Sequence, residues 1–263
     1  NQMCLKYMSG IATAENQEFH PAVRYTAIAV VGDLNRKEAV LSGDSAAADP
    51  MPEALPVLLE EFSRPDQVDA VRVGALVGIL RHVHLDQFRP DLEAAALRRE
   101  LGFAENDIVL LFVGWLYDFA GIDSIMRVLP DLPSNVRLLV VGTGEAEARL
   151  LKLRQSLSIE DRVAFSGKQP YKLVPKIMAL SDICLMYSTI NQVTRHIVPI
   201  KTYEYLASGK PVLASQLPGL MREIPPGNGI IYTSPNQLQL ALKRLLDPET
   251  RRIEGARARA FAE

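Results

Sequence analysis

The fold of this chain is decided by the stretch Ile108-Val-Leu-Leu-Phe-Val-Gly114, six apolar residues that end on a glycine. A continuous apolar run of this length is typical of a strand buried on both faces of a parallel sheet. A second such run, Leu138-Leu-Val-Val-Gly142, follows after a helix predicted through Ile122–Leu129. Strands that alternate with helices predict an α/β domain in which helices cover both faces of a mostly parallel sheet.

Outward from these two runs, the alternation continues along the chain. Further helices are expected at Asp91–Leu101, Glu145–Leu157, Lys172–Ala179, Thr202–Ala207 and Asn236–Leu246, and further strands at Val163–Phe165, Ile183–Met186 and Pro211–Ala214. Ligands of such sheets bind beyond the carboxyl ends of the strands. Those ends carry Gly114, Gly142-Thr-Gly144, Ser166-Gly167, Tyr187-Ser188 and Ser215.

Five blocks in this order carry a family resemblance: LLFVGWLYDFAGID, RLLVVGTGEAEARL, DRVAFSGKQPYKLVPKIMALSDICLMYS, PIKTYEYLASGKPVLAS and GNGIIY. Over about Asp86–Glu263 the sequence resembles the C-terminal, nucleotide-sugar-binding domain of group 1 (family 4) GT-B glycosyltransferases. The resemblance implies a Rossmann-like fold and transfer of a sugar, with retention, from a nucleotide-sugar donor. It implies no metal ion and no cofactor, since GT-B sites stabilise the leaving group with charges of the protein.

The resemblance also implies roles for particular donor-binding residues. Glu204 would accept hydrogen bonds from the ribose, a task that suits a carboxylate because its two oxygens can hold a cis-diol. The loop Phe165-Ser166-Gly167 would lie beside the nucleobase, and Gly114 under the diphosphate. Gly142 and Gly144 would shape the neighbouring turn. The resemblance assigns no residue to the catalytic step.

Three positions depart from the family pattern. Trp115 and Ala120 stand where the family often has an Arg and a Lys that neutralise the diphosphate, and His196 stands in place of the first glutamate of the paired glutamates. Charge stabilisation must then come from elsewhere. Lys201, at the start of the helix that carries Glu204, is the best candidate. Weaker candidates are Arg195 and Lys168. Trp115 would shield the donor site or pack in the core.

Residues 1–85 follow a different pattern. Aligning Arg24 with Arg72 matches Ala-Val-Arg and its following small and aliphatic positions at a fixed offset. Paired helices with small inner faces resemble a HEAT-type repeat, a surface suited to a protein partner. The alternative is two amphipathic helices that share a tripeptide by chance. The expected domains are therefore a helical HEAT-like segment at 1–85 and a donor-binding domain at 86–263.

Composition limits the classes of binding partner and the cellular compartment that we expect for this chain. The 29 basic and 31 acidic residues give a net charge of -2, so nothing favours nucleic acid or an anionic membrane as the main partner. Cys4 and Cys184 lie far apart, which argues against a disulfide framework or a zinc site and for a reducing cytoplasm. The apolar runs are too short to span a bilayer.

Residues 1–85 are too few for the acceptor-binding domain of a GT-B enzyme, so the sequence suggests a truncated or fused chain. Two other functions stay open. One is a non-catalytic module that binds a nucleotide or sugar while the helical segment recruits a partner. The other is a scaffold without ligand, in which Trp115, Ala120 and His196 record loss of the site. Binding of UDP, GDP or ADP would distinguish them.

Overall fold

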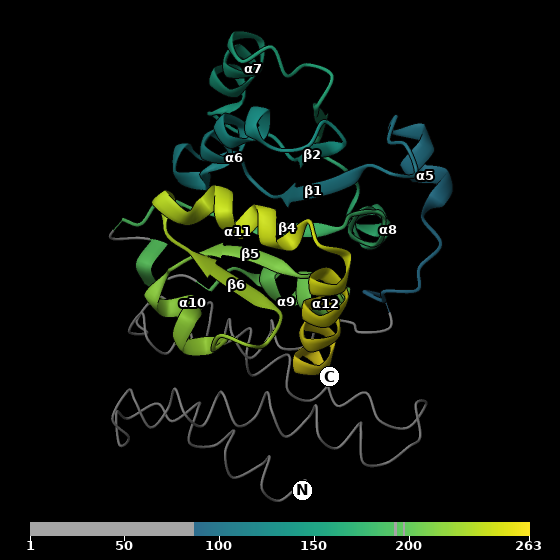
Figure 1. The fold of residues 1–263 in the computed structure, drawn as a ribbon, viewed down its shortest axis with the longest axis vertical. Coiled ribbons are helices and arrows are strands. Elements are labelled where there is room, and N and C mark those ends of the chain that lie inside the picture. Colours follow the sequence, from purple (N-terminus) through teal and green to yellow (C-terminus); the bar gives the residue numbers. More distant parts are fainter. Residues whose placement is uncertain (1–86, 192–193, 197) are drawn as a thin grey trace, which may run out of the picture. The chain divides into compact units, whose positions relative to one another are not determined.

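A computed structural model of the chain describes residues 87–191, 194–196 and 198–263 (Figure 1). These residues belong to one compact unit, His84–Glu263. The HEAT-like repeat predicted for residues 1–85 lies outside the described residues. That segment and the domain boundary near Asp86 therefore stay predictions.

In the part of the chain that the structure describes, six strands form one parallel sheet (Figure 1). The strands are β1 Ile108–Val113, β2 Val136–Val141, β3 Val163–Gly167, β4 Ile183–Met186, β5 Val212–Ser215 and β6 Ile230–Thr233. The predicted Rossmann-like α/β class and the parallel direction of the strands are confirmed. β3 reaches Gly167, so the predicted Ser166-Gly167 end belongs to the strand itself.

The strand order, β3-β2-β1-β4-β5-β6, fixes where a ligand can bind. The chain first builds outward from β1 to β3, then returns to the middle and builds outward from β4 to β6. The order reverses between β1 and β4, whose paired residues include Leu110 with Ile183 and Leu111 with Cys184. At such a reversal the two following loops diverge and leave a crevice at the carboxyl ends of the strands.

Helices cover both faces of the sheet (Figure 1). On one face, α6 (Ile122–Val128), α7 (Glu147–Ser156) and α11 (Leu238–Leu245) bury Met126, Leu150 and Leu242 against alternate strand residues such as Leu110 and Leu138. The strand residues of opposite parity are also buried. They face the layer of α8 (Val174–Leu180) and α9 (Ile200–Ala207), of which α9 packs on β5. The remaining helices are α5 Ala95–Glu100, α10 Pro218–Glu223 and α12 Pro248–Ala262.

The longest described helix, α12, was not among the predicted elements. It has no apolar stripe, and its buried residues are Glu254, Gly255 and Ala258. Small residues replace the stripe, since a Cβ on Gly229 would lie 2.4 Å from Ala258. The helix does begin with a recognisable cap, because the Asp247 carboxylate accepts the backbone N–H of Thr250 at 2.7 Å. Predicted boundaries elsewhere differ by a few residues, most at α5, which begins at Ala95 rather than Asp91.

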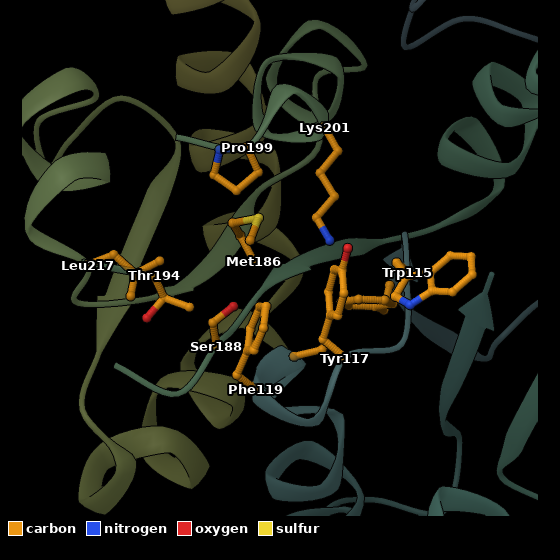
Figure 2. A pocket seen from close by; sticks show the side chains of 11 residues that line it. Trp115, Tyr117, Phe119, Met186, Ser188, Thr194, Pro199, Lys201 and Leu217 are labelled. Carbon is orange, nitrogen blue, oxygen red and sulfur yellow. The ribbon is translucent and has the colours of Figure 1, made fainter. Parts of the chain in front are cut away.

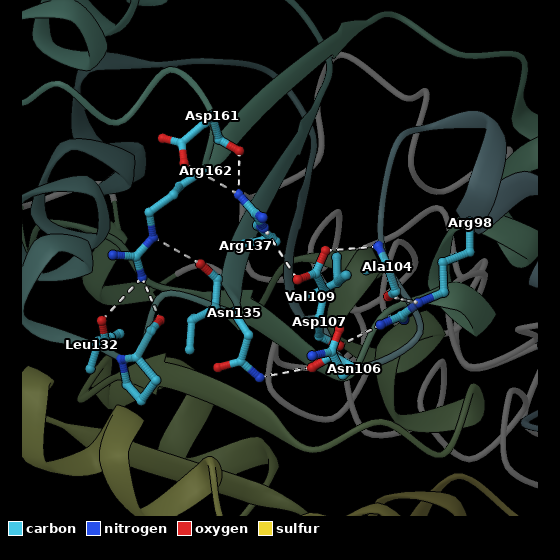
Figure 3. Close-up of polar contacts among 12 residues, drawn as sticks. Arg98, Ala104, Asn106, Asp107, Val109, Leu132, Asn135, Arg137, Asp161 and Arg162 are labelled. Carbon is cyan, nitrogen blue, oxygen red and sulfur yellow. Dashed lines mark hydrogen bonds and ion pairs between the residues drawn. The ribbon is translucent and has the colours of Figure 1, made fainter.

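Arginines and aspartates brace the amino ends of the strands, opposite the crevice (Figure 3). Arg98 donates to the carbonyl of Leu180 at 2.6 Å and pairs with Asp182 at 3.4 Å, and the same carboxylate accepts the backbone N–H of Val109 at 2.8 Å. Arg137 pairs with Asp107 at 3.3 Å. These side chains form ion pairs with one another and hydrogen bonds with backbone groups near the strand ends. We therefore assign them a structural role at this edge of the sheet.

None of the helices that the structure describes is long and apolar enough to cross a membrane. Cys184 is fully buried on β4, and burial raises the pKa of its thiol to about 12. A cysteine in this state packs as a small apolar residue. The cytoplasmic location stays a prediction.

Candidate functional site

The loops that follow β1, β2 and β3 are joined backbone to backbone. Gly114 donates its N–H to the carbonyl of Val141 at 2.9 Å, and Gly142 donates to the carbonyl of Gly167 at 2.9 Å. A Cβ on Gly142 would lie 1.9 Å from the carbonyl oxygen of Gly114, and Gly142 has a φ of 134°. No L side chain fits this approach. Gly142 therefore lies directly against the backbone of Gly114, in a contact that requires glycine.

Lys201 lies in the first turn of α9 and reaches the end of β1. A Cβ on Gly114 would lie 2.9 Å from the Lys201 Nζ, and that ammonium sits 4.0 Å from the centroid of the Phe112 ring. Among the described residues, no hydrogen bond or ion pair reaches Nζ. Burial lowers the pKa of Lys201 to about 8, and nearby Glu204 partly opposes that shift. The three N–H donors of the ammonium are therefore left for an anion.

Glu204 lies three residues further along α9, on the same helical face. It is buried, and its Oε1 accepts a 2.7 Å hydrogen bond from the phenol of Tyr171. Burial raises the pKa of Glu204, whereas the Tyr171 hydrogen bond and the charge of Lys201 lower it. In the described part of the chain Oε2 accepts no hydrogen bond, so one carboxylate oxygen stays open to a further donor.

The predicted loop Phe165-Ser166-Gly167 forms the end of β3 and is partly exposed. Its backbone is engaged in part, because Gln169 donates to the carbonyl of Ser166 at 2.7 Å. The loop is linked to Gly114 through the end of β2, where Gly142 donates to the carbonyl of Gly167 and Val141 accepts the N–H of Gly114. The structure thus brings Gly114 and Lys201 into direct proximity, with Glu204 three residues further along α9 and the β3 loop two strands away.

A cavity of about 400 Å³ opens beside Lys201 (Figure 2). Within the described residues Lys201 is the one charged side chain of its lining. Most of the wall is apolar: Trp115, Tyr117 and Phe119 come from the loop after β1, and Met186, Pro199 and Leu217 come from the β4 and β5 ends and the segment before α9. Polar groups of the described lining are the hydroxyls of Ser188, Thr194 and Tyr117. Glu204 is outside the lining, so the cavity extends from Lys201 without it.

The remaining predicted candidates fall in different places. Trp115 has an exposed fraction of 54%, and its Nε1 donates to Glu145 at 3.1 Å. The alternative that Trp115 packs in the core is therefore wrong. Ala120 is buried and lines the cavity at the position where the family often has Lys. Arg195 and Lys168 are exposed and do not line it. His196 ends the short helix Thr194–His196, and its side chain lies outside the described set.

Sequence reasoning missed two parts of this site. Tyr171 is separated from Glu204 by 33 positions, and no local pattern announces their contact. The aromatic row had a signal that could have been read, since Trp115, Tyr117 and Phe119 alternate along a loop after a strand. In the described part of the chain, no group of three or more His, Cys, Asp or Glu residues could hold a metal ion. The absence of a metal from the reaction stays a prediction.

The strand order and the crevice at its reversal place the described part of the chain among Rossmann-like domains. The chain belongs to the family of glycosyl transferases group 1, whose model matches residues 93–260. It is 27% identical over 169 residues to the N-acetyl-alpha-D-glucosaminyl L-malate synthase of Bacillus anthracis, covering 62% of this chain and 42% of that protein. It is also 27% identical over 205 residues to the D-inositol 3-phosphate glycosyltransferase of Nocardia farcinica, covering 74% and 42%.

Solved structures show the same fold. WaaG, a glycosyltransferase involved in lipopolysaccharide biosynthesis, superposes with a TM-score of 0.58 at 22% identity, over 72% of this chain and 56% of that one. Anabaena Alr3699/HepE in complex with UDP-glucose gives a TM-score of 0.60 at 20% identity, over 73% and 56%. The chain spans less than half the length of the two curated relatives, 42% of each.

Proposed function

We propose that residues 86–263 bind a nucleoside-diphosphate sugar as the donor half of a retaining glycosyltransferase. One observation carries this proposal: the Lys201 ammonium lies beside Gly114 at the reversal of strand order, with no hydrogen-bond partner in the described part of the chain. A desolvated cation without a partner is costly, and a diphosphate supplies the charge and the acceptors that it lacks. Membership of the group 1 family supports the same conclusion.

The other residues divide the donor among them. Residues three positions apart on a helix have Cβ atoms about 5–6 Å apart, so Lys201 and Glu204 can hold neighbouring parts of one nucleotide. Glu204 would accept the ribose hydroxyls, with Oε2 open and Oε1 already fixed by Tyr171. The Phe165–Gly167 loop would read the nucleobase. The solved structure of Alr3699/HepE with UDP-glucose supports a nucleotide sugar as ligand class for this fold.

Lys201 would also serve the transfer step. When the bond between the sugar and the diphosphate breaks, negative charge grows on the departing phosphate oxygen. An ammonium already held at that place stabilises the charge without reorganising solvent. Lys201 would then replace the Arg and Lys that the family often has at the positions of Trp115 and Ala120.

The test is a binding panel of UDP, GDP and ADP with the full chain, measured by isothermal titration calorimetry. We expect one nucleoside diphosphate to bind, and Lys201→Met to weaken it at least about tenfold, as loss of a charged hydrogen bond predicts. Affinity for the matching nucleoside should stay unchanged. Lys243→Met, which alters an exposed lysine on α11, is the matched control. Absence of binding at millimolar concentration would overturn the proposal.

A second candidate is a non-catalytic module that binds the nucleotide sugar, with a partner recruited by the helical segment predicted at 1–85. The observation in its favour is the apolar pair Trp115 and Ala120, which leaves one cation in the cavity lining. Incubation with the bound nucleotide sugar and analysis for released nucleoside diphosphate separates the two. Tight binding without release would favour the module.

A further inference from the structure

The cavity beside Lys201 is placed to hold the sugar of the donor, on the basis of the function proposed above. Lys201 would bind the diphosphate, and Glu204, outside the cavity, would bind the ribose. In a nucleotide sugar the ribose and the hexosyl group leave the diphosphate at opposite ends. If the ribose lies at Glu204 and the diphosphate at Lys201, the hexosyl group would lie on the other side of Lys201, in the cavity. Its volume of about 400 Å³ is within the usual range for small-molecule sites, about 300–1,000 Å³.

The described residues of the lining offer few hydrogen bonds to such a group. The hydroxyl of Thr194 already donates to the carbonyl of Thr189 at 2.7 Å and accepts the N–H of Asn191 at 2.8 Å. The Ser188 backbone N–H and carbonyl are both bonded to Ser215 Oγ, at 2.8 and 2.6 Å. With Lys201 committed to phosphate, the hydroxyls of Ser188 and Tyr117 are the polar side-chain groups of the described lining that make no hydrogen bond within the described part of the chain. A hexose has more hydroxyls than these two can satisfy.

The rest of the wall favours hydrocarbon. The Tyr117 and Phe119 rings stack with centroids 4.8 Å apart at 11°, and Trp115 adjoins Tyr117 with centroids 6.3 Å apart. Trp115 and Tyr117 have exposed fractions of 54% and 43%. Exposed aromatic rings at the mouth of a cavity gain free energy when an apolar ligand surface covers them. In Figure 2, Met186 and Leu217 continue this apolar surface away from Trp115.

We propose that this cavity selects a 6-deoxyhexosyl donor, in which a methyl group replaces the hydroxymethyl group at C6. That exocyclic carbon projects from the ring, and in the proposed placement it would lie among the aromatic and aliphatic side chains. A hydroxyl among these apolar side chains would lose its water with few partners to replace it, whereas a methyl group gains from leaving water. A mostly apolar wall discriminates only modestly, so about a tenfold preference is expected rather than strict exclusion.

Matched donors that differ only at C6 test this proposal on the full chain. The pairs are UDP-galactose with UDP-6-deoxygalactose, GDP-mannose with GDP-6-deoxymannose, and ADP-glucose with ADP-6-deoxyglucose. For the nucleotide that the chain binds, the 6-deoxy member should have a dissociation constant about tenfold lower. Equal affinity for the two members, or tighter binding of the hydroxylated one, overturns this inference. The proposed function still holds in that case, provided that the chain binds the nucleoside diphosphate. Absence of any nucleoside diphosphate binding overturns both.

A variant checks that the aromatic wall makes the selection. Phe119→Gln places hydrogen-bonding groups in the cavity at a partly exposed side chain. It should reduce the preference for the 6-deoxy sugar to about threefold or less and leave affinity for the nucleoside diphosphate unchanged. Leu240→Gln makes a comparable change on α11, where the side chain has an exposed fraction of 70%, and should alter neither quantity. An unchanged preference in Phe119→Gln would remove the aromatic wall from the explanation.

Discussion

The phenol of Tyr171 donates a 2.7 Å hydrogen bond to Oε1 of Glu204, although Tyr171 has an exposed fraction of 60% and Glu204 is buried. The contact fixes one orientation of the carboxylate that we assign to the ribose. Partial burial raises the pKa of Tyr171, and the hydrogen bond to Glu204 and the charge of Glu204 raise it further. Tyr171 therefore stays a hydrogen-bond donor at every physiological pH.

Tyr171→Phe tests this relationship. The variant keeps the ring and its edge contact with Phe88 but removes the hydroxyl. We expect nucleoside affinity to fall about threefold to tenfold, since a side-chain hydrogen bond contributes about 1 kcal/mol. Titration calorimetry with a nucleoside, which lacks phosphate, isolates this effect. Tighter binding by the variant would mean that Tyr171 competes with the ribose for Glu204.

The pH dependence of binding should follow Lys201. Burial lowers the pKa of its ammonium to about 8, so it is charged below that pH and loses its proton above it. Affinity for the nucleoside diphosphate should therefore decline as pH rises through about 8. Affinity for the nucleoside should stay level over the same interval. Lys201→Arg, whose guanidinium keeps its charge, should flatten the decline. A decline of equal size for the nucleoside would point to another group.

The buried charge of Lys201 should also cost stability. Its folded-state pKa of about 8 lies below the ordinary value of 10.5, so the unfolded chain binds more protons between these values. Lys201→Met should raise the free energy of unfolding by about 1–3 kcal/mol below pH 8, a gain that shrinks as pH approaches 10.5. Denaturant titrations at both ends of this window measure it. A variant less stable than wild type at neutral pH would contradict the assignment.

The backbone contact between Gly142 and Gly114 predicts a large cost for Gly142→Ala. Its new Cβ would lie 1.9 Å from a carbonyl oxygen, so the two strand ends must separate. We expect a loss of about 3 kcal/mol or more in unfolding free energy, together with weaker diphosphate binding. Gly227→Ala is the control, because Gly227 has a φ of 93° but open space around its Cβ position. That variant should lose only about 1 kcal/mol, the cost of the backbone conformation alone.

The sequence predicted five of the six described strands because their signals are local, whereas β6 was not predicted. Apolar runs that end on glycine locate β1 and β2. Lys201 and Glu204 lie three residues apart, so they share one face of any helix that contains both. Helix α12 escaped prediction because Gly255 and Ala258 bury it with small residues rather than an apolar stripe. Period-based reasoning detects apolar stripes, not close approaches that depend on the absence of side chains.

The candidate site was predictable only in part, for a related reason. A tryptophan can pack in a core or form the exposed wall of a cavity. Which of the two applies to Trp115 depends on the fold around it, not on its residue type. The partnership of Tyr171 with Glu204 joins the segment after β3 to α9. Such a contact follows from the three-dimensional course of two segments, which no pattern within either segment encodes.

The backbone links among the loops after β1, β2 and β3 have a consequence for the kinetics of binding. Because Gly114, Gly142 and Gly167 are tied through main-chain hydrogen bonds, this surface needs no rearrangement before a ligand arrives. Association should then be a single encounter step. In rapid-mixing experiments the observed rate should rise in proportion to nucleotide concentration, without the plateau that a preceding conformational change imposes.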